Sequence, residues 1–422
     1  MWGGLAGPNQ PECNAKVSGP THDGVALIVV ASVPGDGDQG GQRDSVEYRH
    51  GVTFRVHRRK RTEPAMGAPE DQERAVERAD GSFLAIRRPR LYSKRRRLFG
   101  RRQWLFRRTY ENLWPFASAW SAVCTLSALA DGHAAAGALP LFIDGLAAYH
   151  RSHGAVFGES GPLGFESSVV PPLGTGGDRY FDDNAWLALA LMRHHEINGD
   201  HRALALARRL FDFVLIGWSN EQSWSHPGGI RWKQPTSNTS RNTCSNAPVA
   251  QLGALVHLRT GDEDALIWAI RIYEWVRGVL LSSNGLYFDQ VDPAGRVNTD
   301  VWSYNQGTMI GAGVLLHRIT GERSYLTQAS VTAAASMTRF PAEALVGRDA
   351  AFHAVFFRNL FMLDQVVPDS SYRQLALTYG NGMWEQFRDP STGLFNGNMS
   401  QLNNSAPLVE IYALLAGAPP HP

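Results

Sequence analysis

The sequence of 422 residues predicts an all-α fold, an (α/α)6 toroid of helical hairpins over residues 109–418, preceded by a largely disordered N-terminal extension. Three similar segments indicate the toroid. They begin at Asn184, Asn246 and Asn305, at intervals of 62 and 59 residues. Each contains an apolar stretch, a turn with a glycine, and a second stretch. An interval of about 60 residues exceeds the tetratricopeptide, ankyrin and HEAT lengths and fits a ring of hairpins with long loops.

Within each segment, the two stretches predict helices of different burial. Residues 185–192 are apolar on every side, so this helix must be surrounded by other helices. The stretch after Asp200 is amphipathic, with its apolar residues between 206 and 214 on one face. Buried and half-buried helices in alternation describe two concentric layers. We expect a helix at residues 404–415 to close the ring.

The first part of the chain has a different composition. Residues 1–86 are rich in Gly, Pro, Asp, Gln and Arg, as in residues 35–41, and show little periodicity. Such a segment buries too little apolar surface to offset its conformational entropy. We therefore expect a low-complexity, disordered extension with one or two short strands.

Residues 87–108 form a basic lead-in segment with eleven Arg or Lys and no acidic residue. Leu98, Phe99, Trp104 and Phe106 are interleaved with the charges, which favours an amphipathic helix. A solvated linker, a membrane-surface contact and an anionic-polymer contact all remain open. The whole chain has a formal net charge of only +2, so the rest is net acidic and no nucleic-acid partner is expected.

Several functional classes have no support in the sequence. Cys13, Cys124 and Cys244 form no disulfide framework, and no metal-binding or nucleotide-binding motif occurs. We expect neither a metal nor a cofactor. No signal peptide or membrane-spanning run is recognisable, which favours a cytoplasmic location, and we expect a monomer.

Two adjacent acids, Asp182 and Asp183, stand where a glycine-rich loop meets the first apolar helix. Acids in a first helical turn often only cap the helix. Here, however, the helix belongs to the inner layer, so its start should face the central cavity. Glycoside hydrolysis requires two carboxyl groups, and retaining enzymes hold them about 5 Å apart, which neighbouring residues can supply. We therefore predict that Asp182 and Asp183 are catalytic.

Aromatic and amide side chains at equivalent positions are candidates for sugar binding. Aromatic rings would stack on pyranose faces and amides would bind hydroxyl groups, although core packing and loop structure are the simpler alternatives. Asp289 is either a third carboxylate at the mouth or a turn cap. The predicted substrate-binding residues are Phe181, Trp186, Trp232, Asn246, Asp289, Trp302, Tyr304, Asn305 and Gln306.

Several motifs, in this order and spacing, resemble glycoside hydrolase family 76, the α-1,6-mannanases. The matching segments are residues 180–186 (YFDDNAW), 228–232 (GGIRW), 245–248 (SNAP), 304–307 (YNQG), 310–311, 356–360 and 408–412. The resemblance implies an (α/α)6 barrel and retaining, endo-acting hydrolysis of α-1,6-linked mannan without a metal. It further implies that Asp182 is the nucleophile and Asp183 the general acid/base. Leu187 replaces a tryptophan usual in the family, and Arg231 replaces an apolar or aromatic residue. Members of the family are often secreted, which is the alternative to the cytoplasmic location.

Three alternatives accompany this prediction. A transglycosylase would use the same pair on the same α-mannan, with a sugar in place of water. A non-catalytic glycan-binding scaffold would have no reason to retain both aspartates. A sugar epimerase on a similar toroid would need paired histidines, which no predicted inner helix carries at its start.

Overall fold

The computed structural model describes residues 45–48, 52–55 and 69–420, except 89–90, 105–106, 131, 153–161, 235–236 and 418. The chain divides into two compact units, Met1–Glu63 and Pro64–Pro422. In the first unit, β1 (Ser45–Tyr48) pairs with β2 (Val52–Arg55) as an antiparallel hairpin. The disorder predicted for the rest of this unit lies outside the described residues.

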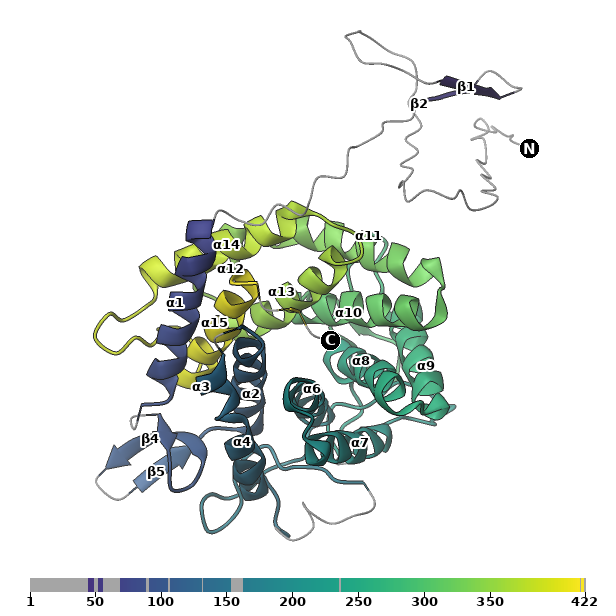
Figure 1. Ribbon diagram of the computed structural model, residues 1–422. Coiled ribbons are helices and arrows are strands. Elements are labelled where there is room, and N and C mark those ends of the chain that lie inside the picture. Colours follow the sequence, from purple (N-terminus) through teal and green to yellow (C-terminus); the bar gives the residue numbers. More distant parts are fainter. Residues whose placement is uncertain are drawn as a thin grey trace, which may run out of the picture. The chain divides into compact units, whose positions relative to one another are not determined.

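In the second unit, six helices of the described residues form a closed inner ring (Figure 1). Each contacts the next, and the last contacts the first, which confirms the predicted (α/α)6 toroid. Their apolar sequences leave no polar face, and residues 184–194, for example, are all buried. These helices are α2 (Leu113–Ser127), α6 (Phe181–Asn198), α8 (Thr243–Thr260), α10 (Ser303–Thr320), α13 (Ala350–Asp364) and α15 (Gln401–Leu415).

An outer layer of helices packs against this ring. Its main members are α1 (Pro69–Ile86), α4 (Leu139–Leu146), α7 (His201–Leu215), α9 (Glu263–Leu280), α11 (Arg323–Arg339) and α14 (Ser370–Gln386). Short helices α3 (His133–Ala136), η1 (Ala147–Tyr149) and α12 (Ala342–Leu345) lie in the connections. Gly199, Gly261 and Gly321 end three inner helices with φ of 71°, 71° and 76°, a left-handed conformation that glycine adopts at low cost.

Helix α1 contradicts the predicted boundary at residue 86, because its residues belong to the toroid rather than to the extension. It packs on α15 and supplies the outer layer at that position. Ala75, Ala79, Phe83 and Ile86 form its buried face. The stripe is made mainly of small residues among many charges, so its helical period is weak in the sequence.

The helix expected around Leu98 to Phe106 is also wrong. This segment forms β4 (Leu98–Trp104), between β3 (Tyr92–Ser93) and β5 (Arg107–Tyr110) in an antiparallel sheet. Leu98 and Phe99 are buried, and the Phe99 ring lies 5.8 Å from that of Phe142 on α4. The adjacent apolar pair anchors the sheet to the outer layer, a contact that the local charge pattern does not reveal.

A buried ionic cluster ties together four inner helices. Oε1 of Glu410 on α15 accepts hydrogen bonds from Arg193 on α6 (3.0 Å) and Arg358 on α13 (2.6 Å), while Ser121 on α2 donates to Oε2 (3.2 Å). Although burial opposes ionisation, the two guanidinium groups hold the pKa of Glu410 below its usual value. The cluster therefore helps to fix the closure between the last and first inner helices.

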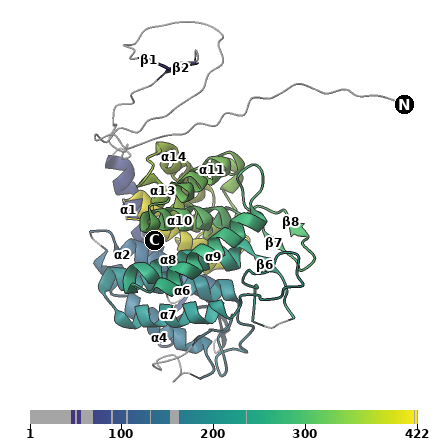
Figure 2. The same ribbon diagram turned by 90° about the vertical axis from the view of Figure 1, so that its right-hand side faces the viewer.

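Because each outer helix returns the chain, all six inner helices of the described residues begin at the same end of the ring. The loops before them gather there and include a small sheet of β6 (Arg241–Asn242), β7 (Gln290–Val291) and β8 (Val297–Asn298) (Figure 2). Among the described residues, no helix combines the length and apolar character needed to cross a membrane.

Candidate active site

Amide side chains near the starts of three inner helices hold the preceding loops. Asn184 accepts a hydrogen bond from the backbone N–H of Phe165 (2.7 Å) and donates to its carbonyl (3.1 Å). Asn246 does the same with Ile230, at 2.7 and 2.9 Å. Each amide also donates to the carbonyl four residues earlier in the chain. The repeated asparagine therefore fixes the loops that surround the mouth.

Gln306 has this role in α10, where its side chain accepts from the Tyr287 N–H and donates to the Tyr287 carbonyl, both at 2.8 Å. Asn246 and Gln306 are fully buried, and both hydrogens of each amide are used. The prediction that these two amides bind sugar hydroxyls is therefore wrong, because backbone groups of the loops already occupy them.

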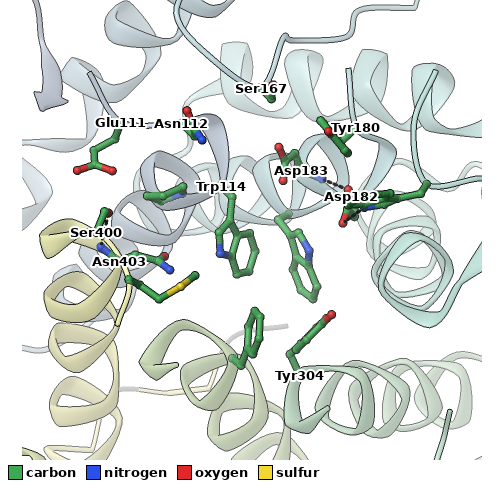
Figure 3. A pocket seen from close by; sticks show the side chains of 15 residues that line it. Glu111, Asn112, Trp114, Ser167, Tyr180, Asp182, Asp183, Tyr304, Ser400 and Asn403 are labelled. Carbon is green, nitrogen blue, oxygen red and sulfur yellow. Dashed lines mark hydrogen bonds between the residues drawn. The ribbon is translucent and has the colours of Figure 1, made fainter. Parts of the chain in front are cut away.

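The second or third residue of each inner helix lies at the mouth. Five of these six side chains line a cleft of about 510 Å³, and the sixth, Cys244, contacts Asp182 inside it (Figure 3). The position follows from helix geometry, because a side chain in the first turn projects towards the end of the helix where the chain enters. The six residues are Trp114, Asp182, Cys244, Tyr304, Phe352 and Asn403.

Asp182 is held by three hydrogen-bond donors. Its Oδ2 accepts from the indole N–H of Trp232 at 3.0 Å and from the thiol of Cys244 at 3.5 Å. Its Oδ1 accepts from the backbone N–H of Asp183 at 3.0 Å. Donors to a carboxylate favour its charged form, so this arrangement favours an ionised and oriented Asp182.

The Asp183 side chain differs from its neighbour. Among the described residues, none donates a hydrogen bond to its carboxyl group, which lines the cleft. Burial, followed by the nearby charge of Asp182, raises the pKa of Asp183 well above its usual value. Burial also raises the pKa of Asp182, to about 6, although its three donors lower it. The pair therefore favours one proton, held by Asp183, beside an ionised Asp182.

Aromatic rings form one wall of the cleft. Trp186 lies edge-on between Trp114 and Tyr304, with ring centroids 5.4 and 6.4 Å apart, respectively. Tyr304 packs at 4.3 Å against Phe352. Trp232 stands beside Asp182 with 37% of its surface exposed. The structure thus brings the predicted Trp186, Trp232 and Tyr304 together with the two aspartates.

Other predicted residues lie outside the cleft lining. Phe181 is fully buried against Phe213, with ring centroids 5.3 Å apart, so the prediction of sugar stacking by Phe181 is wrong. Asn305 is also fully buried, without a hydrogen-bond partner among the described residues. Trp302 is 37% exposed but packs at the rim against Phe352.

Asp289 precedes β7 and is also absent from the lining of the cleft. Burial, and then the charge of Asp300, raises the pKa of Asp289 to about 6. Asn298 donates a hydrogen bond of 3.3 Å to its carboxyl group. Asp289 remains a candidate for the outer mouth. Among the described residues, no group of three His, Cys, Asp or Glu side chains is arranged to hold a metal.

Sequence reasoning missed much of the cleft because it followed only the three similar segments. The starts of α2, α13 and α15 are less alike in sequence but occupy equivalent places in the ring. Examining the first turn of every apolar helix would have found Trp114, Phe352 and Asn403. The other unpredicted lining residues are Glu111, Asn112, Pro115, Ser167, Tyr180, Met399 and Ser400.

Comparison with known proteins identifies the family of this chain. A family model described as glycosyl hydrolase family 76 matches residues 166–401, more than half of the chain. The chain belongs to glycosyl hydrolase family 76. The matched range contains Asp182 and Asp183, whereas Asn112, Trp114 and Asn403 lie outside it.

Several curated proteins are similar to part of this chain. Mannan endo-1,6-alpha-mannosidase DCW1 of Saccharomyces cerevisiae is 29% identical over 216 residues, 45% of this chain and 47% of the yeast protein. The protein of the same name from Candida albicans is 30% identical over 159 residues, 34% of each chain. The chain thus spans about half the length, or less, of the curated relatives it matches.

Solved family 76 structures share the fold over most of the chain. A mannosidase from Bacteroides thetaiotaomicron has a TM-score of 0.67 at 21% identity, covering 81% of this chain and 98% of that one. An inactive variant of a Salegentibacter α-1,6-mannanase, with two consecutive aspartates changed to asparagine, is solved with α-1,6-mannotriose. Its TM-score is 0.63 at 23% identity, covering 81% and 99%. A D-mannose isomerase has a TM-score of 0.62 at 12% identity, covering 84% and 99%, so the toroid alone does not define the reaction.

Proposed function

We propose that this protein is a retaining glycoside hydrolase that cleaves α-1,6-linked mannan within the chain. The observation that carries the proposal is the unequal environment of two adjacent carboxyl groups in an open, aromatic-lined cleft. Asp182 has three donors and favours the charged form, whereas Asp183 has none and favours the protonated form. Retaining hydrolysis needs one carboxylate and one carboxylic acid close together.

In the first step, Asp182 attacks the anomeric carbon of the mannosyl unit while Asp183 gives its proton to the glycosidic oxygen. The carbon–oxygen bond to the leaving sugar breaks, and a mannosyl ester forms on Asp182. The donors around Asp182 orient its carboxylate before the attack, which reduces the entropy that must be lost in the transition state.

In the second step, Asp183 is a carboxylate and removes a proton from water as the water attacks the same carbon. The ester bond breaks, the oligomannoside is released with the α configuration retained at its new reducing end, and Asp183 recovers its proton. Trp186, Trp232 and Tyr304 would support the sugar rings, since aromatic faces pack well against the C–H faces of a pyranose.

The choice of substrate rests on the relatives. Several curated proteins similar to this chain are named mannan endo-1,6-alpha-mannosidases, and a family 76 enzyme of the same fold has been solved with α-1,6-mannotriose. The cleft suits a neutral sugar, because none of its described lining residues is Lys or Arg and three are acids. An anionic ligand would be repelled.

The decisive experiment is incubation of the full chain with linear α-1,6-mannan, with products analysed by mass spectrometry and by NMR of the anomeric protons. We expect oligomannosides released initially as the α-anomer. Initial β-anomer would overturn retention, and products longer than the substrate would identify transglycosylation. The Asp182→Asn/Asp183→Asn variant is the control, and equal release by this variant would overturn the role of the pair.

A further inference from the structure

The cleft has a second polar end, away from the two aspartates. One side of this end comes from the start of α2, with Asn112 and Trp114, and the other from the start of α15, with Ser400 and Asn403 (Figure 3). These segments are far apart in the sequence but meet because α15 contacts α2 and closes the ring. The family match covers little of this end.

Asn403 is the most informative residue at this end. The residue is only 2% exposed, yet it lines the cleft. Its Oδ1 has no hydrogen-bond partner among the described residues, and no described residue accepts a hydrogen bond from its Nδ2. An unpaired buried amide is costly, so an unexplained one at a cleft wall points to a ligand.

Comparison with equivalent positions on the other inner helices shows why the Asn403 amide has no loop backbone to bind. In α6, α8 and α10, an amide two residues further along holds the loop backbone. In α15, Ser405 takes this role by accepting a hydrogen bond of 3.0 Å from the Phe395 N–H. Asn403 stands two residues before Ser405, just as Asp182 stands two residues before Asn184. Asn403 therefore occupies the place in α15 that the proposed nucleophile occupies in α6.

The aromatic wall connects the two ends of the cleft. Trp114 and Trp186 pack edge-on at 5.4 Å, and both line the same cleft. Glu111 also lines the second end, so its charge does not favour a phosphate or sulfate group there. Amide, hydroxyl and indole groups without a cation match the hydroxyls and apolar face of a neutral hexose.

We propose that the end of the cleft between α2 and α15 is a sugar subsite, in which Asn403 and Trp114 bind a mannosyl unit beyond the bond that is cleaved. This inference rests on the proposed mannanase function and adds how the protein holds a chain rather than a single sugar. Binding at both ends lets an internal bond lie over Asp182 and Asp183, as endo-action requires.

The test is calorimetric titration of α-1,6-mannotetraose into the inactive Asp182→Asn/Asp183→Asn protein, with and without Asn403→Leu. Leucine has a similar volume but lacks the amide. We expect Asn403→Leu to weaken binding roughly five- to tenfold, the effect of losing one hydrogen bond. Asn220→Leu, at an exposed position outside the cleft, is the matched control and should leave the affinity unchanged.

Each outcome separates the two proposals. Unchanged affinity in a folded Asn403→Leu protein would overturn the subsite and leave the mannanase function intact. Failure of the parent protein to bind any α-1,6-mannooligosaccharide would overturn both. Thermal melting shows whether the variant is folded, and Asn403→Ala is the replacement if leucine prevents folding.

Discussion

The indole N–H of Trp232 donates a hydrogen bond of 3.0 Å to the carboxyl group of Asp182, although the two residues lie 50 positions apart. Asp183, one residue further on, has no such donor among the described residues. The tryptophan is thus one of three donors that make two chemically identical neighbours unequal. The proposed division into nucleophile and acid depends on this inequality.

Replacement of Asp183 by alanine should lower kcat on mannan by about 10²- to 10⁴-fold, the usual contribution of a general acid. The loss should be much smaller on an aryl α-mannoside whose leaving group needs no proton. Azide should then restore turnover and yield the α-mannosyl azide, measured by NMR. Asp182→Ala lacks the nucleophile, and recovery of an α product with azide in that variant would contradict the assignment.

Trp232→Phe keeps an aromatic ring but removes the donor to Asp182. Loss of a donor to a carboxylate raises its pKa, so the acid limb of the kcat/KM profile should move to higher pH. The shift should be about one pH unit, the effect of one hydrogen bond to a charged group. Trp302→Phe, at the rim, is the control, and an equal shift in that variant would contradict the specific role of Trp232.

Cys244 provides a finer test of the same carboxyl group, because its thiol lies 3.5 Å from Oδ2 of Asp182. Cys244→Ser substitutes a stronger donor and should move the acid limb to lower pH, whereas Cys244→Ala should move it to higher pH. The measurement is again the pH dependence of kcat/KM. Shifts of the same sign in both variants would indicate a packing effect instead.

Asn246→Ala should destabilise the fold even though the residue is not in the cleft. The change leaves the backbone N–H and carbonyl of Ile230 unpaired in a buried site, and the free energy of unfolding should fall by about 2–4 kcal/mol. Urea unfolding measures this loss. Asn305→Ala is the control, because it removes a buried amide without a hydrogen-bond partner among the described residues, and it should lower the free energy of unfolding by less. A larger loss in Asn305→Ala than in Asn246→Ala would contradict the role of Asn246 in holding the loop.

Glu410→Ala should also be strongly destabilising, by about 3–5 kcal/mol, because it leaves Arg193 and Arg358 buried without their shared carboxylate. The depressed pKa of Glu410 means that its contribution is present above the unfolded-state pKa and is lost as the pH falls through the folded value. Glu274→Ala removes an exposed partner of Arg277 and should change stability by less than about 1 kcal/mol. Equal losses of unfolding free energy in Glu410→Ala and Glu274→Ala, measured by urea unfolding, would contradict the stabilising role of the buried cluster.

The fold was predictable because α6, α8 and α10 are apolar on most sides and each is followed by a turn with a glycine. The two aspartates and Trp186 were predictable for the same reason, since they share the first turns of one inner helix. The prediction that Asn246 and Gln306 bind sugar hydroxyls was wrong because the sequence does not distinguish an amide that binds a sugar from one that holds a loop. Which backbone group an amide meets depends on tertiary packing. Asn403 was missed because α15 places serine at the loop-holding position, which hides the repeat.

The closed ring has a consequence for the order in which the protein is made. A circular array of consecutive hairpins has one seam, and here the seam lies between α2 and α15. The cleft crosses that seam, and Trp114 of α2 is therefore synthesised almost 300 residues before Asn403 of α15, which lies on the other side of it. The aspartate pair is synthesised long before the wall that faces it. A nascent chain that stops short of α15 carries both proposed catalytic groups but lacks the surface proposed to grip a polymer.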